Sequence, residues 1–223
     1  MPALRVLALG KLGLSDAATS KLFSASVPQL RILALIEMNV QSAAARALAA
    51  TGWPLEELNL SRNPLGAAGI AKLLAAPTFS IRRLSLAFCR LDAASVLAVA
   101  NAPWPLEELN LSGNDFSTAA AGPALAALSR HAGLRRLRVN GCIFGPASFK
   151  ALVEASWPAL ASFDAETAVV TPDYPLALGA AAFAGFPALE ELAMPRVILD
   201  EAGAALLLSR RWPRLKKLDL RGV

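Results

Sequence analysis

The sequence predicts an α/β solenoid, with parallel strands on its inner side and helices on its outer side. Residues 55–65 (LEELNLSRNPL) recur almost unchanged at residues 106–116 (LEELNLSGNDF), and a looser copy stands between them at residues 81–91 (IRRLSLAFCRL). The leading apolar residue of this segment returns every 25 to 29 residues along the whole chain. Each copy is followed by a second half that fits a helix. A repeat of this length indicates one strand–helix unit per copy, packed against its neighbours.

Nine leading positions divide residues 1–223 into nine units, which we expect to form a single array. They are Leu4, Leu30, Leu55, Ile81, Leu106, Leu134, Leu160, Leu189 and Leu215. Apolar residues at the fourth and sixth positions of a unit, such as Leu58 and Leu60, alternate as in a strand with one buried face. In residues 66–76, Ile70 and Leu74 recur at helical spacing. We therefore expect a strand and then a helix in every unit.

The junctions between units carry signals for helix ends. Ser15 and Asp200 are expected N-caps. Proline, which cannot continue a helix, follows tryptophan at four junctions, Trp53-Pro54, Trp104-Pro105, Trp157-Pro158 and Trp212-Pro213. We expect each indole to close the core between a helix and a strand, and an exposed binding role is the alternative. The seventh unit is the least regular, because residues 167–175 read as a loop insertion.

The segments described above fit the pattern L-x-x-L-x-L-x-x-N/C-x-L, and the chain resembles the leucine-rich-repeat proteins, in particular their ribonuclease-inhibitor-like class. The resemblance covers all nine units and implies a curved horseshoe segment with strands on the concave face and helices on the convex face. It also implies an intracellular protein that holds other proteins. Asn63, Cys89, Asn114 and Cys142 match the N/C position. Apolar residues occupy it in the first two and last three units, whose turns we expect to be less tightly fixed.

The composition excludes several classes of protein. Hydrophobic residues make up 55% and charged residues 17% of the chain, which is incompatible with disorder. The longest uncharged run, residues 174–189, falls short of the ~20 residues of a membrane span and is broken by proline and glycine. The N-terminus lacks the features of a signal peptide. With only two cysteines, the chain is expected to be an intracellular, cytoplasmic protein.

Residues with reactive side chains are few. Cys89 and Cys142 stand two units apart, roughly 10 Å, which exceeds the reach of a disulfide, so we expect two structural thiols. His131, the one histidine, is expected to cap the end of the fifth helix, with Gly133 as the C-terminal glycine. No nucleophile elbow, zinc motif or phosphate loop is present. We expect no catalysis, no metal and no cofactor.

The concave face is the expected binding surface, because the third, fifth and seventh residues of each unit point into it. The candidate partner-binding residues are Val6, Ile32, Ile36, Asn59, Arg83, Ser85, Asn110, Arg136, Arg138, Asp164, Glu191 and Asp219. The apolar stretch at the first two strands has two readings, a protein-interface hot spot or a surface covered by chain absent from this sequence. Tyr174, in the seventh-unit insertion, is a possible rim contact or part of an ordinary loop.

Charges on this face alternate in sign from unit to unit. The second and third positions read Glu56-Glu57, Arg82-Arg83, Glu107-Glu108, Arg135-Arg136, and later Glu190-Glu191 and Lys216-Lys217. Neighbouring strands therefore place opposite charges side by side, either as a ladder that fixes register or as a charge-coded partner surface. Because arginines and glutamates interleave, the net charge of +5 forms no continuous basic groove. We expect neither a nucleic acid nor a membrane as the partner.

These observations together predict a non-catalytic module that binds another protein on the concave face. One alternative, drawn from relatives of this fold, is a regulatory subunit such as a GTPase activator or the substrate-recognition part of a ubiquitin ligase. Another is a structural, oligomerising segment. The first and ninth units lack the polar caps that solenoids use, so the array reads as uncapped at both ends. A piece of a longer array and end-to-end self-association both fit that reading, and the identity of the partner stays open.

Overall fold

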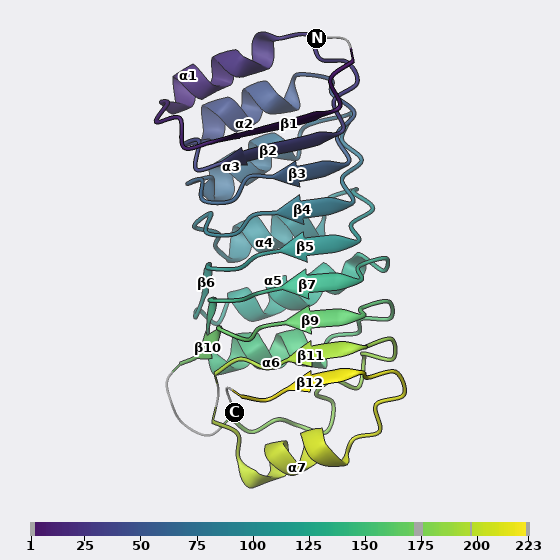
Figure 1. The fold of residues 1–223 in the computed structure, drawn as a ribbon. Helices are drawn as coiled ribbons and strands as arrows, with labels where there is room; N and C mark the ends of the chain where they lie inside the picture. Colours follow the sequence, from purple (N-terminus) through teal and green to yellow (C-terminus); the bar gives the residue numbers. More distant parts are fainter. Residues whose placement is uncertain (1–2, 172–175, 197, 222–223) are drawn as a thin grey trace.

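The chain folds into two layers. In the computed structural model, which describes residues 3–171, 176–196 and 198–221, nine parallel strands form one sheet in chain order and helices stack along one side of it (Figure 1). The strands are β1 (Val6–Gly10), β2 (Ile32–Ile36), β3 (Glu57–Asn59), β4 (Arg83–Ser85), β5 (Glu108–Asn110), β7 (Arg136–Arg138), β9 (Ser162–Asp164), β11 (Glu191–Ala193) and β12 (Lys217–Asp219). The predicted α/β solenoid is confirmed.

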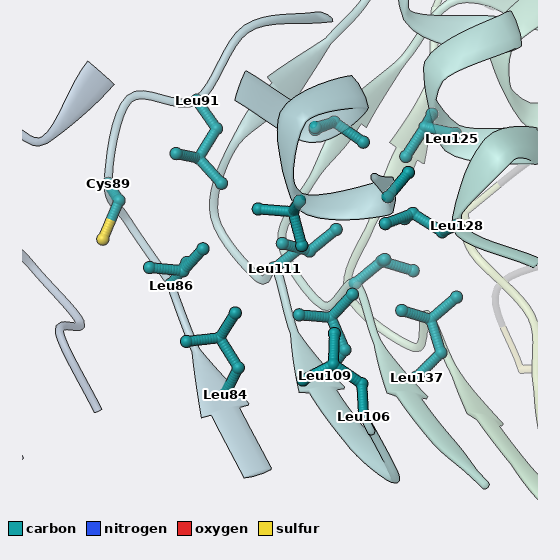
Figure 2. Close-up of a cluster of buried hydrophobic side chains, with 14 of the residues drawn as sticks. Leu84, Leu86, Cys89, Leu91, Leu106, Leu109, Leu111, Leu125, Leu128 and Leu137 are labelled. Atoms are coloured by element: carbon teal, nitrogen blue, oxygen red, sulfur yellow. The ribbon is translucent and has the colours of Figure 1, made fainter. Parts of the chain in front are cut away.

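The strands form because the apolar residue at the fourth position is buried in units two to eight, whereas its two neighbours point away from the core. Leu58, Leu84 and Leu109 stand beside one another in the register, so equivalent residues of successive units stack. All three are at most 2% exposed. Figure 2 shows leucines of β4, β5 and β7 lying between the sheet and the helical layer, where Leu125 and Leu128 meet them. One continuous core results, and each unit depends on the next to cover it.

The helical layer follows the predicted plan in most units. Its helices are α1 (Asp16–Lys21), α2 (Ser42–Ala49), α3 (Gly66–Leu73), α4 (Ala93–Ala100), α5 (Ala121–Ala127), α6 (Pro146–Glu154) and α7 (Glu201–Ser209), with short 3-10 turns η1 (Leu22–Ser24) and η2 (Leu128–Arg130). Both predicted N-caps are confirmed. Ser15 Oγ accepts from the Ala18 N–H at 3.1 Å, and Asp200 Oδ1 accepts from the Gly203 N–H at 2.7 Å. None of the helices in the described part of the chain could cross a membrane.

The seventh unit departs from the prediction of a helix in every unit. The described residues between β9 and β11 form no helix, and the prediction is wrong there. Phe183 and Phe186 fill the space instead, with ring centroids 5.3 Å apart and both side chains buried. Phe183 also donates its N–H to the Val153 carbonyl at 2.7 Å, which ties the segment to α6. Two aromatic side chains thus replace the apolar stripe of a helix.

A second, smaller sheet was not anticipated from the sequence. It consists of β6 (Asp115–Phe116), β8 (Ile143–Phe144) and β10 (Val169–Val170), three short parallel strands that follow the turns of the fifth, sixth and seventh units. The predicted loop insertion at residues 167–175 therefore begins as a strand, which corrects that interpretation. Phe116 and Phe144, paired in this sheet, are fully buried. Their burial explains why the segment is ordered against the core.

The tryptophans close the core as expected. Trp53, Trp104 and Trp157 are 2% to 4% exposed and lie beneath the junctions that their Trp-Pro pairs mark. Trp157 donates its indole N–H to the Leu152 carbonyl at 3.0 Å, so its polar atom is satisfied inside the core. Trp212 is only partly buried and makes the equivalent bond to Leu207 at 3.2 Å.

The turns of the second and fourth units are each fixed by an asparagine of the unit that follows. Asn63 Oδ1 accepts from the N–H groups of Met38 and Val40, both at 2.9 Å, while Nδ2 donates to the Leu35 carbonyl. Asn114 repeats the arrangement on the turn that contains Cys89. The expectation that the second unit's turn is loose is therefore wrong, because the asparagine that fixes it belongs to the third unit.

Candidate functional site

The sheet face that points away from the helices, called the concave face below, carries the predicted site residues in two rows. The first row is the third position of each unit, Val6, Ile32, Glu57, Arg83, Glu108, Arg136, Ser162, Glu191 and Lys217. The second row is the fifth position, Ala8, Ala34, Asn59, Ser85, Asn110, Arg138, Asp164, Ala193 and Asp219. Ile36 lies on the same face, at the end of β2.

The alternating charges pair across neighbouring strands, as predicted. In the first row Arg83 lies 2.6 Å from the carboxylate of Glu57, and Arg136 lies 2.5 Å from that of Glu108. The hydrogen bond from Arg136 lowers the pKa of Glu108, and the bond to Glu57 raises the pKa of Arg83. These side chains are largely exposed, so each pair stabilises the fold by less than about 1 kcal/mol. Their main effect is to leave most of the first row electrically neutral.

A second line of ion pairs runs beside the first, at the second position of the units. The pairs are Arg31–Glu56, Arg82–Glu107 and Lys216–Glu190. In each of them the basic and acidic residues come from adjacent units and stand directly before their strands. The charge ladder is therefore a property of the fold. It supports the register of neighbouring strands directly.

The side-chain oxygens of the two second-row asparagines accept hydrogen bonds within the turns that follow their strands. Asn59 Oδ1 accepts from the Ser61 N–H, and Asn110 Oδ1 accepts from the Ser112 N–H, both at 3.0 Å. The oxygens of these two side chains are thus engaged by their own strands. Their amide nitrogens make no hydrogen bond to any other described residue and remain available as donors on the concave face. The sequence pattern alone did not indicate this division of the amide group.

Arg138 interrupts the second row. It stands in register between Asn110 on β5 and Asp164 on β9. Within residues 3–171, 176–196 and 198–221 its guanidinium forms no ion pair and no hydrogen bond. Asp164 instead accepts from Asn140 Nδ2 at 2.8 Å. Arg138 is therefore an exposed, unpaired cation in the middle of a face where Arg83 and Arg136 are both paired.

Two hollows of about 210 Å³ each lie on the concave face, one on either side of β7. The first is lined by both first-row ion pairs, by Asn59, Ser85 and Asn110, and by Arg138. The second lies over β9 and β11 and is lined by Asp164 and Glu191 among others. Arg136 and Arg138 border both hollows. A space of this size fits one or two side chains of a protein partner and is small for a cofactor.

The other predicted residues are placed less centrally. Val6 is 54% exposed and Ile32 and Ile36 are half-buried, so an apolar patch does lie beside the first hollow. Glu191 accepts from the Ser162 hydroxyl at 3.1 Å. Asp219 is held by Arg221, whose hydrogen bond lowers the pKa of that carboxyl to about 2. Tyr174, the expected rim contact, lies outside the described residues.

The reactive side chains are engaged in the fold. Cys89 and Cys142 are free and buried, and their thiols donate to the carbonyls of Leu60 and Leu111 at 3.1 and 3.2 Å. Burial raises the pKa of Cys89 to about 11 and that of Cys142 to about 12. Both thiols therefore stay protonated at neutral pH. In the part of the chain that the structure describes, no three His, Cys, Asp or Glu side chains gather as metal ligands.

His131 caps the end of the fifth unit's helical segment, as expected, because it is the C-cap of η2 and its N–H donates to the Leu128 carbonyl. Its Nε2 donates to the Val99 carbonyl at 2.9 Å, near the end of α4, so it closes the helix of the preceding unit. The histidine itself follows η2. The expectation of Gly133 as the C-terminal glycine is wrong, because Gly133 does not have the left-handed φ that such a cap requires.

Comparison with known proteins agrees with the architecture. The model of the family described as "Leucine Rich repeat" matches residues 54–74 and 105–121, which contain β3 and β5 with the turns after them. These two segments match the leucine-rich repeat, and the chain has the leucine-rich-repeat fold. No curated protein sequence matches it significantly. The family match falls on the two most regular units, where the asparagines Asn63 and Asn114 stand.

Two solved structures share the fold of this leucine-rich-repeat chain. One is the crystal structure of a TLR13–ssRNA13 complex, with a TM-score of 0.64, 19% identity, and coverage of 98% of this chain and 29% of that chain. The other is an internalin (inlF) from Listeria monocytogenes, with a TM-score of 0.52, 15% identity, and coverage of 97% and 61%. The chain thus spans less than a third of the first protein and about three fifths of the second.

Proposed function

We propose that this leucine-rich-repeat chain binds another protein through its concave face, with Arg138 pairing to a carboxylate of the partner. The observation that carries the proposal is the state of Arg138. It is the second-row residue at the border of both hollows, and it lacks an ion pair among the described residues. Arg83 and Arg136 have already found carboxylates within the chain.

The first hollow suits a carboxylate for two reasons. Its two ion pairs cancel, so Arg138 supplies its net positive charge. The amide nitrogens of Asn59 and Asn110 add neutral donors on the same face. Hydrogen bonds to a charged group contribute roughly 1.5–3 kcal/mol, more than neutral ones, so one Asp or Glu of the partner would define the contact.

The apolar patch of Val6, Ile32 and Ile36 supplies the second part of the proposed interface. Protein interfaces combine an apolar core with polar groups around it. This patch lies on the same face as the first hollow, one strand away from it, since β2 pairs with β3. A partner that covers both would bury the exposed Val6 side chain, which supports the interpretation of this stretch as contact surface.

A protein partner is favoured over a nucleic acid. TLR13 is seen in complex with ssRNA13, so RNA deserves an explicit test for this chain. Binding of a phosphate backbone requires a continuous run of unpaired basic groups. Here Glu57 and Glu108 interleave with Arg83 and Arg136 and neutralise them. The absence of RNA binding stays a prediction.

The proposal is tested by selecting 14-residue random peptides, displayed on phage, against the immobilised chain. Dissociation constants of the selected peptides are then measured by fluorescence anisotropy for the wild type, Arg138→Glu and Ile32→Glu. We expect Arg138→Glu to weaken binding about 10-fold or more, since a reversed charge removes at least 1.4 kcal/mol of a charge-assisted contact. Ile32→Glu should weaken the peptides that also cover the apolar patch.

The matched control is Lys72→Glu, the same change of charge on the exposed side of α3. It should leave the peptide affinities within about twofold, because surface charges beyond a Debye length of ~8 Å are screened. Equal affinities for the wild type and Arg138→Glu would refute the concave-face proposal. Tight binding of a labelled 13-nucleotide single-stranded RNA, lost in Arg138→Glu, would replace protein by RNA as the partner.

A further inference from the structure

The eighth residue of the first six units has a left-handed backbone. These residues are Lys11, Glu37, Arg62, Phe88, Gly113 and Gly141, with φ between 55° and 68°. The N–H groups of the first five donate to a carbonyl of the next unit, for example Phe88 to Ser112 at 2.8 Å. The fold therefore imposes this conformation, whichever residue stands there. Glycine, which occupies the position in the fifth and sixth units, adopts it without strain.

Phe88 is the residue least suited to this position. A bulky side chain with positive φ is a genuine outlier, because its Cβ crowds the following carbonyl. Burial does not compensate, since Phe88 remains 48% exposed. Residues in such conformations concentrate at functional sites, where the surroundings hold them in place.

The ring of Phe88 is held between two neighbours. The Arg62 guanidinium lies 4.7 Å from the ring centroid, in cation–π geometry. Against the ring lies Gly113, where a Cβ would come within 2.2 Å of it. The absence of a side chain at Gly113 thus makes room for the ring. An exposed aromatic side chain fixed in this way has already lost the freedom that a flexible one would lose on binding.

A second positive charge lines the same hollow as the ring. Arg90 is exposed, has a φ of 55°, and lines a hollow of about 470 Å³ together with Phe88, Leu91, Gly113, Asn114 and Asp115. Neither Arg62 nor Arg90 forms an ion pair within the described ranges. Asp115, the one acid there, accepts from the Ser117 N–H at 2.9 Å.

The same units carry the first hollow of the concave face. Strands β3, β4 and β5 line that hollow and run directly into the turns that hold Arg62, Phe88 and Gly113. Adjacent strands lie ~4.8 Å apart, so three units span roughly 10 Å, whereas an extended 14-residue peptide reaches roughly 45 Å. One segment of a partner can therefore contact both places.

We infer that Arg62, Phe88 and Arg90, the rim patch, form a second contact surface that takes an apolar side chain flanked by carboxylates on a protein partner. This inference rests on the proposed protein-binding function and extends it from the concave face to the rim. Charge complementarity decides the chemistry of the partner, because two unpaired guanidinium groups frame one fixed ring. Aromatic and arginine side chains are also the types that dominate binding hot spots.

The test uses the peptides selected on the wild-type chain and adds Phe88→Gly and Arg90→Glu to the panel with Arg138→Glu and Lys72→Glu. Selected peptides should contain Asp or Glu beside an aliphatic or aromatic residue. Phe88→Gly should weaken them about 10-fold, the size of a hot-spot loss. Arg90→Glu should weaken them several-fold and reduce the dependence of affinity on salt.

Each pattern of losses decides between the two surfaces. Losses confined to Arg138→Glu would overturn the rim patch and leave the concave-face proposal intact. Losses confined to Phe88→Gly and Arg90→Glu would support the rim patch and refute the concave face. Peptides that tolerate all of these substitutions, or a selection that yields no Phe88-dependent peptide, would overturn the inference. So would a labelled 13-nucleotide RNA that binds the wild type and not Phe88→Gly, because the ring would then be a base-stacking platform.

Loss of folding is separated from loss of contact by the choice of glycine. Phe88→Gly removes a strained side chain and introduces the residue that the next two units have at this position. The melting temperature of this variant should therefore stay within about 3 °C of the wild type. Phe88→Ala keeps a Cβ in the left-handed region and serves as the second variant. Equal loss of affinity in both, with an unchanged circular dichroism spectrum, assigns the loss to the ring.

Discussion

Units three to six and units seven to nine share one strand pattern, yet their interiors are completed in different ways. In the first group every fourth-position leucine is buried, and the N/C position holds Asn63, Cys89, Asn114 and Cys142, all bonded to backbone of the preceding unit or its turn. In unit seven of the second group, Ala168 occupies that position and two phenylalanines take the place of a helix. In unit nine, Leu218 on β12 is 38% exposed.

The difference shows that a unit of this solenoid is completed by its neighbours. Asn63 satisfies the turn of the second unit, and His131 closes the helix of the fourth. Identical residues therefore contribute different free energies according to what covers them. Both proposed contact surfaces centre on units three to six, where these ties between units hold the loops and strands in fixed positions.

The largest expected effect compares two leucines at the same repeat position. Leu109→Ala should lower the free energy of unfolding by about 3 kcal/mol, because it leaves a cavity in a closed core. Leu218→Ala should lower it by about 1 kcal/mol or less, because that side chain is already partly in water. Urea denaturation followed by circular dichroism measures both. Equal losses would mean that the two groups of units are packed alike.

A smaller effect is expected from two asparagines of the third unit. Asn63→Ala leaves buried N–H groups of Met38 and Val40 without an acceptor, which should cost about 2–3 kcal/mol. Asn59→Ala removes two part-buried hydrogen bonds from Ser61 within the turn and should cost about 1 kcal/mol. The same denaturation experiment compares them. Similar losses for both variants would contradict a special role of the N/C position in joining units.

The smallest effect concerns the ion-pair ladder and depends on pH. Arg136 lowers the pKa of Glu108 in the folded chain below the ~4.3 of an unfolded glutamate. The stabilisation is therefore complete above about pH 4.3 and is lost as the pH falls through the folded-state pKa. Glu108→Gln should cost less than about 1 kcal/mol at pH 7, and its difference from the wild type should shrink as the pH falls below about 4.3.

Glu191→Gln is the matched control for that titration, since Glu191 occupies the same row in the second group and forms no ion pair among the described residues. Its loss at pH 7 should be smaller than that of Glu108→Gln. A Glu108→Gln variant whose deficit persists unchanged at pH 3 would show that the substitution acts through packing and not through the charge.

Much of the fold was readable from the period of the leucines. Alternation around Leu58 and Leu109 predicted the strands, and the alternating glutamates and arginines predicted the ion pairs, because parallel strands in register bring equal positions together. The absence of a helix in unit seven could not be predicted from the sequence. Phe183 packs against Trp212 and Phe186 against Trp157, and these contacts exist only in the folded chain. The small sheet that contains Phe116 was not predicted either, because its strands have two residues each and two residues show no periodic pattern.

The candidate site divides in a similar way. The sequence by itself determined the array, its rows of side chains and the sign of each charge, because these follow from a period that every unit repeats. Only the tertiary structure decided that Arg138 is unpaired, that Asn59 and Asn110 keep their nitrogens free, and that Phe88 is fixed and exposed. Each of these depends on which atoms of the next unit come within hydrogen-bonding or contact distance, and a repeat pattern carries no such distances.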